Sequence, residues 1–256
     1  MTAPWLSHWG RVRGAVVWQV LTTALAGLAS PAHVLDAGGG TGGLAVPLAL
    51  LGHRVTVVDP SPDSLAALER RSVEAAPGGS LALTAVQGDL TTLPDVVEPG
   101  SVDLVLCHSV LEVVDDPAAG LAAVAATLRA GGLASVLVAN RSAAVLSRAL
   151  SGHFTEAAAA LDDADGRWGP ADAARRRFGR DDLLDLVAAA GLRADEVHGV
   201  RVFSDLVPGA LVDADVAAVD DLVALELAAS RRPPYADLAT QLHVLASRVT
   251  TSQVTP

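Results

Sequence analysis

The stretch VLDAGGGTGGLAV, residues 34–46, constrains the fold more than any other part of this chain. A short apolar run suited to a buried strand passes directly into a loop with five glycines in six positions: Gly38, Gly39, Gly40, Gly42 and Gly43. Because these residues lack Cβ atoms, the loop can bend sharply and a ligand can lie directly on its backbone. The stretch therefore predicts a strand, a ligand-binding loop and a helix, as in doubly wound α/β folds.

Short Val- and Leu-rich runs alternate with helical patterns along much of the chain, which is typical of βαβ units and a mostly parallel sheet. We expect seven strands, at residues 33–36, 54–58, 81–86, 102–107, 133–138, 197–202 and 242–246. We expect helices at 14–28, 43–51, 62–76, 117–129, 181–190 and 213–230. The prediction is a Rossmann-like α/β fold with helices on both faces of a mostly parallel seven-stranded sheet.

The helix predicted at 117–129 has clear signals at both ends. Asp116 is a good N-cap and Pro117 suits the first helical position. The pair Gly131 and Gly132 is expected to stop the helix.

Residues 141–180 break the alternation, because helical patterns and a Gly/Pro loop from Gly166 to Pro170 follow the fifth strand. We interpret 141–180 as a helical cap inserted over the strand ends of a single domain, 1–256, with residues 1–30 forming an N-terminal helix. Asn140, directly before the insertion, could bind substrate or cap its first helix. The sequence favours neither.

Composition narrows the class of protein. Although 51% of the residues are hydrophobic, no apolar run reaches the ~18 residues that a membrane span needs, and the N-terminus lacks the layout of a signal peptide. The single cysteine, Cys107, excludes an intrachain disulfide and a cysteine-based metal cluster. We expect a cytoplasmic protein that uses no membrane and no metal.

Charge is unevenly distributed along the chain. The net charge of −11 argues against nonspecific coating of nucleic acid. However, all basic residues are arginines, and residues 141–180 carry seven of them against five acids. Residues 1–30 add Arg11 and Arg13 without any acid. These segments could face one substrate, or they could be ordinary solvated helix surface.

The glycine loop fits two classes of ligand. Gly38, Gly40 and Gly43 satisfy the dinucleotide pattern G-x-G-x-x-G. Asp36 with Gly38, Gly40 and Gly42 gives D-x-G-x-G-x-G, the corresponding loop of S-adenosyl-L-methionine (SAM) methyltransferases. With either ligand, Asp59 at the end of the second strand could accept hydrogen bonds from two ribose hydroxyls.

Three further positions favour SAM. Asp36 would accept from the amino group of a cationic amino-acid ligand, but it would repel a pyrophosphate. Gly88 and Asp89, after the third strand, suit an adenine edge, with the carboxylate on the exocyclic amine and a backbone N–H on a ring nitrogen. His108 ends the fourth strand and is expected to face the crevice. The combination resembles class I SAM-dependent methyltransferases.

Several segments also resemble a narrower family, the bacterial tRNA 5-carboxymethoxyuridine methyltransferases. They are RVRGAVVWQVL (11–21), VLDAGGGTG (34–42), LCHSVLEVVDDP (106–117), LASVLVANRSAAVLSRALSGHF (133–154), GVRVFSDLV (199–207) and LELAASRRPPYADLATQLHVLA (225–246). The chain departs from that family at Val113, where Trp is usual, and at Ala174–Arg177 with Arg180, which replace a lysine cluster.

This resemblance implies that the carboxylate of a modified uridine at the tRNA wobble position, in the anticodon stem-loop, is esterified. SAM would be the methyl donor and S-adenosyl-L-homocysteine (SAH) the product. The resemblance and the loop pattern place SAM against Arg13, Asp36, Gly38, Gly39, Gly40, Asp59, Gly88, Asp89 and His108.

The chemistry of the acceptor decides which side chains matter. A carboxylate is already ionised, so its methylation needs positioning and exclusion of water rather than a general base. An arginine fork would aim one oxygen, and the candidates are Arg141 and Arg201. Arg201 could equally be a structural ion-pair partner of Asp205. A hydroxyl or amine acceptor would make His108 the natural base.

Candidates for contact with RNA are Arg175, Arg176, Arg177 and Arg180 for phosphates, and Trp5, Trp9 and Trp168 for stacking on a base. A solvated surface and ordinary packing are the simpler interpretations of these residues. Two other functions stay open: a SAM-dependent methyltransferase of a small carboxylic acid or hydroxyl compound, and a SAM-binding protein without transferase activity.

Overall fold

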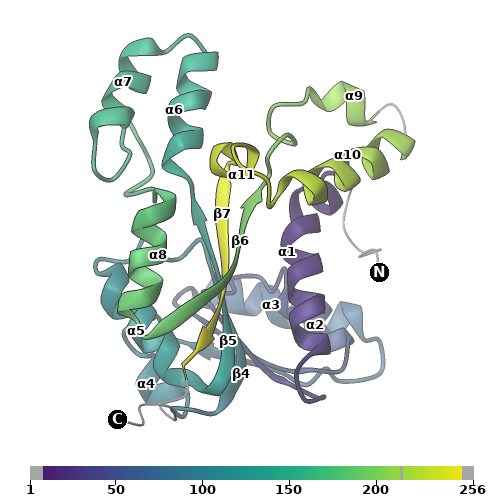
Figure 1. Ribbon diagram of the computed structural model, residues 1–256. Coiled ribbons are helices and arrows are strands. Elements are labelled where there is room, and N and C mark those ends of the chain that lie inside the picture. Colours follow the sequence, from purple (N-terminus) through teal and green to yellow (C-terminus); the bar gives the residue numbers. More distant parts are fainter. Residues whose placement is uncertain (1–7, 214–215, 250–256) are drawn as a thin grey trace. The chain divides into compact units, whose positions relative to one another are not determined.

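The computed structural model describes residues 8–213 and 216–249. The chain divides into two compact units. Unit 1 comprises Met1–Thr23, Leu137–Leu183 and Glu196–His243, and unit 2 comprises Ala24–Val136, Leu184–Asp195 and Val244–Pro256. Figure 1 labels the helices and strands.

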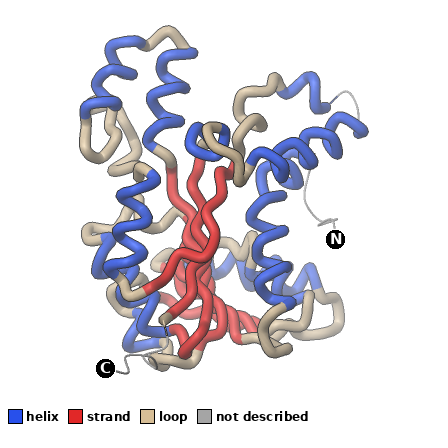
Figure 2. Tube along the Cα trace, viewed as in Figure 1, coloured by secondary structure: helices blue, strands red, loops and turns tan. Residues whose placement is uncertain are grey.

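Seven strands form one sheet, drawn in red in Figure 2, with the order β3-β2-β1-β4-β5-β7-β6. Their bounds are β1 His33–Ala37, β2 Arg54–Asp59, β3 Leu83–Gln87, β4 Val102–His108, β5 Leu128–Ala139, β6 Leu192–Val200 and β7 Gln241–Arg248. The sheet is mostly parallel, and β1 pairs in parallel with both β2 and β4. The seven strands and the Rossmann-like class predicted from the sequence are confirmed.

The register of the central strands aligns their carboxyl ends. Ala37 of β1 lies opposite Val58 of β2 and Cys107 of β4, and Asp59 lies opposite Gln87 of β3. The residues that directly follow these pairs are therefore presented along one edge of the sheet.

The helices are α1 His8–Ala26, α2 Ala45–Leu50, α3 Pro62–Ala75, α4 Leu93–Val96, α5 Pro117–Thr127, α6 Arg141–Leu150, α7 Phe154–Asp162, α8 Arg180–Ala189, α9 Gly209–Asp213, α10 Val216–Ala229 and α11 Tyr235–Leu238. Local sequence explains where several of them begin. Ser61 and Asp116 cap α3 and α5 with their side chains, and each is followed by a proline.

The predicted end of the helix at 117–129 is wrong. The helix α5 ends at Thr127, and β5 already begins at Leu128 and runs through Gly131 and Gly132. Two features of the folded sheet favour the strand. Leu128 is fully buried, and Arg129 forms an ion pair with Asp103 of β4. The tertiary contacts of β5 therefore override the two-glycine stop signal.

In unit 2, β1, β2 and β4 form the core. Val34, Leu35, Val55, Val57, Leu104, Val105 and Leu106 are completely buried. Burial on both faces explains why these strands read as continuous apolar runs rather than alternating ones.

In unit 1, α6 and α7 lie side by side, joined by a short turn (Figure 1). Arg148 of α6 pairs with Glu156 of α7 at 3.1 Å. The structure thus confirms helices followed by a loop in the segment 141–180. That this segment covers the strand ends as a cap stays a prediction. Among the described residues, no helix is long and apolar enough to cross a membrane.

Candidate active site

The glycine loop of unit 2 joins β1 to α2 and is held by backbone hydrogen bonds. Gly38 N–H donates to the carbonyl of Val58 at 2.7 Å, and Gly42 N–H donates to the carbonyl of Gly39 at 3.0 Å. Gly40 N–H donates to Oδ2 of Asp59 at 2.8 Å. The loop is therefore folded against the end of β2.

Asp59 is buried at the end of β2, and backbone groups hold both of its carboxylate oxygens. Oδ2 accepts from Gly40, and Oδ1 accepts from Ser61 N–H at 2.9 Å. A carboxylate has about four acceptor positions. Asp59 is thus oriented by the loop and keeps the capacity to accept from two ribose hydroxyls.

Two positions show why glycine is needed in this loop. A Cβ on Gly39 would lie 2.6 Å from Cγ of Asp36, so any larger residue would push that carboxyl aside. Gly40 has φ +52°, and a Cβ there would have only Oδ2 of Asp59 nearby, at 3.9 Å. The surface of the loop at Gly40 is therefore open, as a cradle for a ligand requires.

Asp36 lies within β1, and its side chain is buried. Burial, together with the negative charge of Asp59, raises the pKa of Asp36 to about 7 from the usual 3.8. A nearby cation would reverse this shift, because it favours the charged carboxylate. The site is thus suited to a positively charged amino group.

Gly88 and Asp89 follow β3. Gly88 N–H donates to the carbonyl of Asp59 at 3.2 Å, which ties this turn to the end of β2. Oδ1 of Asp89 accepts from the hydroxyl and the N–H of Thr91, at 2.6 and 2.9 Å, and from Thr92 N–H at 3.1 Å. The Thr91 hydroxyl is the main reason why the pKa of Asp89 is lowered. Asp89 is therefore an exposed, ionised acceptor.

His108 ends β4, as predicted, and is half-buried. Its Nε2 lies 2.8 Å from the hydroxyl of Ser135 on β5. Burial lowers the pKa of His108 to about 4, so the ring is neutral at pH 7. The neighbouring thiol of Cys107 is neutral too, because burial raises its pKa to about 12.

Unit 2 thus brings most of the predicted cofactor residues to the carboxyl ends of four adjacent strands. The strand order reverses at β1 and β4, which is the switch point where open α/β sheets bind ligands. Arg13 is the exception: it belongs to unit 1, where its partner is Asp205 at 3.4 Å.

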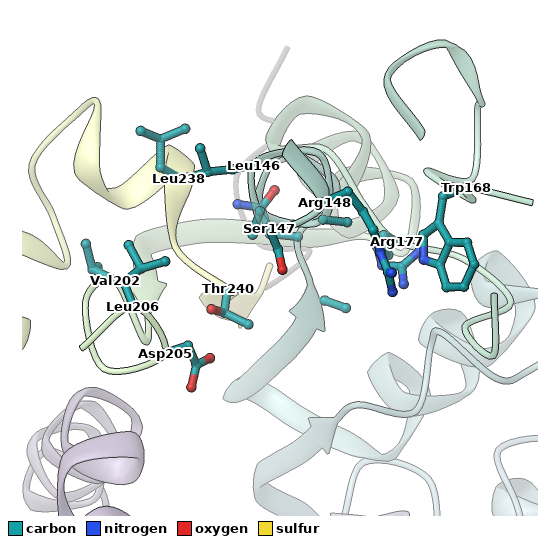
Figure 3. A pocket seen from close by; sticks show the side chains of 14 residues that line it. Leu146, Ser147, Arg148, Trp168, Arg177, Val202, Asp205, Leu206, Leu238 and Thr240 are labelled. Atoms are coloured by element: carbon teal, nitrogen blue, oxygen red, sulfur yellow. The ribbon is translucent and has the colours of Figure 1, made fainter. Parts of the chain in front are cut away.

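Unit 1 contains a cavity of about 260 Å³. Arg148, Arg177 and Trp168 group on one side of it, and Val202, Asp205 and Leu206 lie on the other (Figure 3). The remaining lining residues are Ala139, Asn140, Ala143, Ala144, Leu146, Ser147, Leu238 and Thr240. The guanidinium of Arg148 lies 4.0 Å from the centre of the Trp168 ring, which is stacking distance.

The two arginines predicted to orient an acceptor are both paired with a carboxylate. Arg141 contacts Asp182 at 2.5 Å, and Arg201 contacts Asp205 at 2.5 Å. In each case the Nε atom is buried and has no hydrogen-bond partner within the part of the chain that the structure describes. The buried Nε atoms are out of reach of a ligand, but the side chains of Arg141 and Arg201 are 28% and 27% exposed, so part of each guanidinium group is accessible.

Most of the arginines predicted to contact phosphate also have acidic partners. Arg176 lies 3.8 Å from Asp165, and Arg180 lies 3.0 Å from Asp237. Arg177 makes two hydrogen bonds to Asp172, at 2.7 and 3.0 Å, and a third to the carbonyl of Gly166. Arg175 is exposed. Ion pairing reduces the positive field that this cluster can offer to RNA.

Asn140 caps the insertion, one of its two predicted roles. Its Oδ1 accepts from Ser142 N–H at 3.0 Å, and its Nδ2 donates to the carbonyls of Asp237 and Ala239. Trp168 lines the cavity. Trp5 and the side chain of Trp9 lie outside what the structure describes. The described residues contain no group of three or more His, Cys, Asp or Glu residues that could hold a metal ion.

Sequence reasoning missed Glu226 of α10. This carboxylate is completely buried and accepts hydrogen bonds from three consecutive backbone N–H groups, those of Val202, Phe203 and Ser204. One signal was available: Glu226 is the lone acid in the apolar stretch LVALELAA.

Residues 35–136 match the sequence model of a methyltransferase domain family. Solved structures share the fold over most of the chain. Magnesium protoporphyrin IX methyltransferase from Synechocystis PCC 6803, with bound SAH, is 17% identical with a TM-score of 0.59, over 94% of this chain and 83% of that one. Geranyl diphosphate C-methyltransferase from Streptomyces coelicolor A3(2), also with SAH, is 18% identical with a TM-score of 0.60, over 94% and 80%.

The fold is therefore the Rossmann-like fold of class I methyltransferases, and the glycine-loop site lies within the part of the chain that matches a methyltransferase domain. Among curated proteins, the chain is 29% identical to the tRNA 5-carboxymethoxyuridine methyltransferase of Escherichia coli (strain K12), over 93% of this chain and 89% of that protein. It is also 35% identical to the ubiquinone biosynthesis O-methyltransferase of Xanthomonas campestris pv. campestris (strain B100), but over only 47% of this chain and 48% of that protein.

Proposed function

We propose that this methyltransferase esterifies the carboxylate of 5-carboxymethoxyuridine at the wobble position of tRNA. The observation that carries the proposal is the extent of the similarity to the E. coli tRNA methyltransferase. That similarity covers 93% of the chain and so extends far beyond residues 35–136. It therefore includes much of unit 1, where acceptor specificity would be expected.

We assign the cofactor to unit 2. Asp59 would hold the ribose hydroxyls, Asp36 the amino group, and Asp89 with Gly88 the adenine edge. SAM supplies a methyl group on a positively charged sulfur. The open backbone at Gly40 and the oriented carboxylate of Asp59 support this assignment.

We assign the acceptor to unit 1. The exposed parts of the guanidinium groups of Arg201 and Arg141 would donate to the acceptor carboxylate, and the paired Asp205 and Asp182 would hold each fork in place. The fork must leave free the lone pair that attacks the methyl group. His108 is neutral at pH 7 and would act as a polar neighbour of the cofactor, not as a base.

The experiment is nucleoside mass spectrometry of tRNA from cells that lack this modification activity, treated with purified protein and SAM. We expect 5-carboxymethoxyuridine to gain the mass of one methylene group. Mild alkali should reverse this gain in mass, because the product is an ester. An unchanged nucleoside with intact SAH binding would contradict the tRNA assignment. A tRNA acceptor would place the protein in the cytoplasm.

A second candidate is a small-molecule acceptor. It is favoured by the ion pairs of Arg176, Arg177 and Arg180, which leave the predicted RNA surface largely neutralised. Methyl transfer from labelled SAM to a panel of small carboxylic acids and phenols, but not to tRNA, would support it.

A further inference from the structure

The turn after β6 carries much of one cavity wall in unit 1. Val202, Asp205 and Leu206 line the cavity, and Arg201 begins the turn and pairs with Asp205. Arg201 has φ +63°, a left-handed conformation that is unfavourable for a residue with a side chain. Something must therefore hold the turn in this shape.

Glu226 of α10 is the group that holds it. Its Oε2 accepts from Val202 N–H at 2.8 Å, and its Oε1 accepts from Phe203 N–H at 2.9 Å and from Ser204 N–H at 2.7 Å. Burying a carboxylate is costly unless hydrogen bonds replace its lost water, and three charge-assisted bonds do so here. One end of the same turn is fixed by Thr240 N–H, which donates to the carbonyl of Arg201 at 3.2 Å.

We propose that Glu226 is a positioning residue for the methyl acceptor, acting through Arg201 and Asp205. It fixes the backbone from which Arg201 projects, and thereby the direction of a guanidinium group whose Nε–H is buried and whose side chain is 27% exposed. The inference rests on the proposed function only in taking the acceptor carboxylate as the ligand of Arg201. The contact of Glu226 with the turn links two segments that are separate in the sequence, GVRVFSDLV (199–207) and LELAAS (225–230).

The chemistry of the contact predicts what a substitution does. In Glu226→Gln the side chain keeps its size, but it loses its charge and turns an amide NH₂ donor toward N–H donors. The turn would then relax and Arg201 would lose its direction. Small displacements of a group that orients a reactant can cost about 100-fold in rate.

The first test is kinetic and uses the full-length protein with tRNA containing 5-carboxymethoxyuridine. Glu226→Gln is expected to lower kcat/KM for tRNA about 100-fold, with the dissociation constant of SAH unchanged. Asp221→Asn is the matched control, because Asp221 is an exposed acid on the same helix. If Glu226→Gln fails to fold, Glu226→Asp serves instead, with a smaller loss expected.

A double-mutant cycle separates positioning from mere stability. Arg201→Gly deletes the guanidinium and suits the left-handed backbone. If Glu226 acts through Arg201, Glu226→Gln causes little further loss of kcat/KM in the Arg201→Gly background. Equal losses in both backgrounds, or a parallel loss of SAH binding, would overturn the proposal.

A spectroscopic readout is independent of the acceptor. The NMR signal of Arg201 Nε–H, assigned by its absence in Arg201→Gly, is expected to shift and to exchange faster with water in Glu226→Gln. A shifted signal in a protein that does not methylate tRNA would uphold the positioning role and reject the proposed acceptor. An unshifted signal would reject the positioning role whatever the acceptor is.

Discussion

Oδ2 of Asp59 accepts a hydrogen bond from the backbone N–H of Gly40 at 2.8 Å, so the acid at the end of β2 and the glycine loop after β1 form one structure. The second oxygen of Asp59 is held by Ser61 N–H. The carboxylate that we assign to the ribose is therefore oriented before any ligand arrives, which reduces the entropy cost of binding.

The raised pKa of Asp36 predicts how SAM binding depends on pH. The ionised carboxylate is the form that binds an amino group, and its pKa in the free protein is about 7. Affinity for SAM should therefore fall about tenfold for each pH unit below 7. Asp36→Asn should bind weakly and without this dependence. Calorimetric titrations across this range test the point, with 5′-methylthioadenosine, which lacks the amino-acid part, as a ligand that should not respond.

The raised pKa of Asp36 also predicts how the stability of the folded protein depends on pH. Because folding raises the pKa of Asp36 above 3.8, the folded state favours the protonated carboxyl. The resulting stabilisation of the folded state is fully present below about pH 4 and is lost as the pH rises through about 7. Thermal unfolding of the free protein should show a smaller loss of stability over this interval in Asp36→Asn than in the wild type. An identical loss in both would contradict the assignment.

Two glycines of the loop should respond differently to the same change. In Gly39→Ala the new methyl group would meet the Asp36 carboxyl at 2.6 Å, whereas at Gly43 a Cβ has nothing within 4 Å. Gly39→Ala should therefore destabilise the protein by about 1–3 kcal/mol and weaken SAH binding. Gly43→Ala should leave the melting temperature near that of the wild type. Equal melting temperatures for the two variants would show that the loop is not packed as described.

Substitutions of Arg177 and Arg175 should distinguish an effect on folding stability from an effect on RNA binding. The side chains of Arg177 and Asp172 are only 15% and 2% exposed, so removing one partner leaves a buried charge. Arg177→Ala should cost about 3–5 kcal/mol of unfolding free energy. Arg175 is exposed, so Arg175→Ala should fold normally.

If Arg175 contacts a tRNA phosphate, the salt dependence of binding reports it. The slope of log affinity against log salt should fall by about one in Arg175→Ala, with SAH affinity unchanged. Filter-binding titrations at several salt concentrations measure both. An unchanged slope would assign Arg175 to solvated surface.

His108 should not determine the pH profile of the reaction. Burial lowers its pKa to about 4, and a carboxylate acceptor needs no base. We expect kcat to show no inflection from His108 between about pH 6 and 8, and we expect His108→Asn to lose less than tenfold in kcat at saturating SAM. A loss of 100-fold or more, with a new pH dependence, would identify His108 as a general base and would favour a hydroxyl acceptor.

The sequence predicted the strands and the position of the glycine loop well, because both depend on local pattern. Apolar runs such as LVLC in β4 are completely buried, and the glycines at 38–43 mark the turn between β1 and α2. The pairing of Arg201 with Asp205 was also foreseeable, since the two residues are four apart in sequence.

Contacts between residues far apart in the sequence could not be predicted from the sequence. Arg11 finds Asp220, 209 residues away, and Glu226 binds a turn 22–24 residues earlier. Such contacts depend on the packing of whole helices, and no local signal encodes them. For the same reason the end of α5 was misplaced: β5 gains its contacts to β4 only in the folded sheet.

The most direct test of the central claim is a calorimetric titration with SAH. The wild type should bind one SAH per chain, and Asp59→Ala should bind at least about 100-fold more weakly, because it loses charge-assisted hydrogen bonds to two ribose hydroxyls. Asp63→Ala, a change of an exposed acid in the first turn of α3, should bind like the wild type. Wild-type affinity in Asp59→Ala would contradict the cofactor site described here.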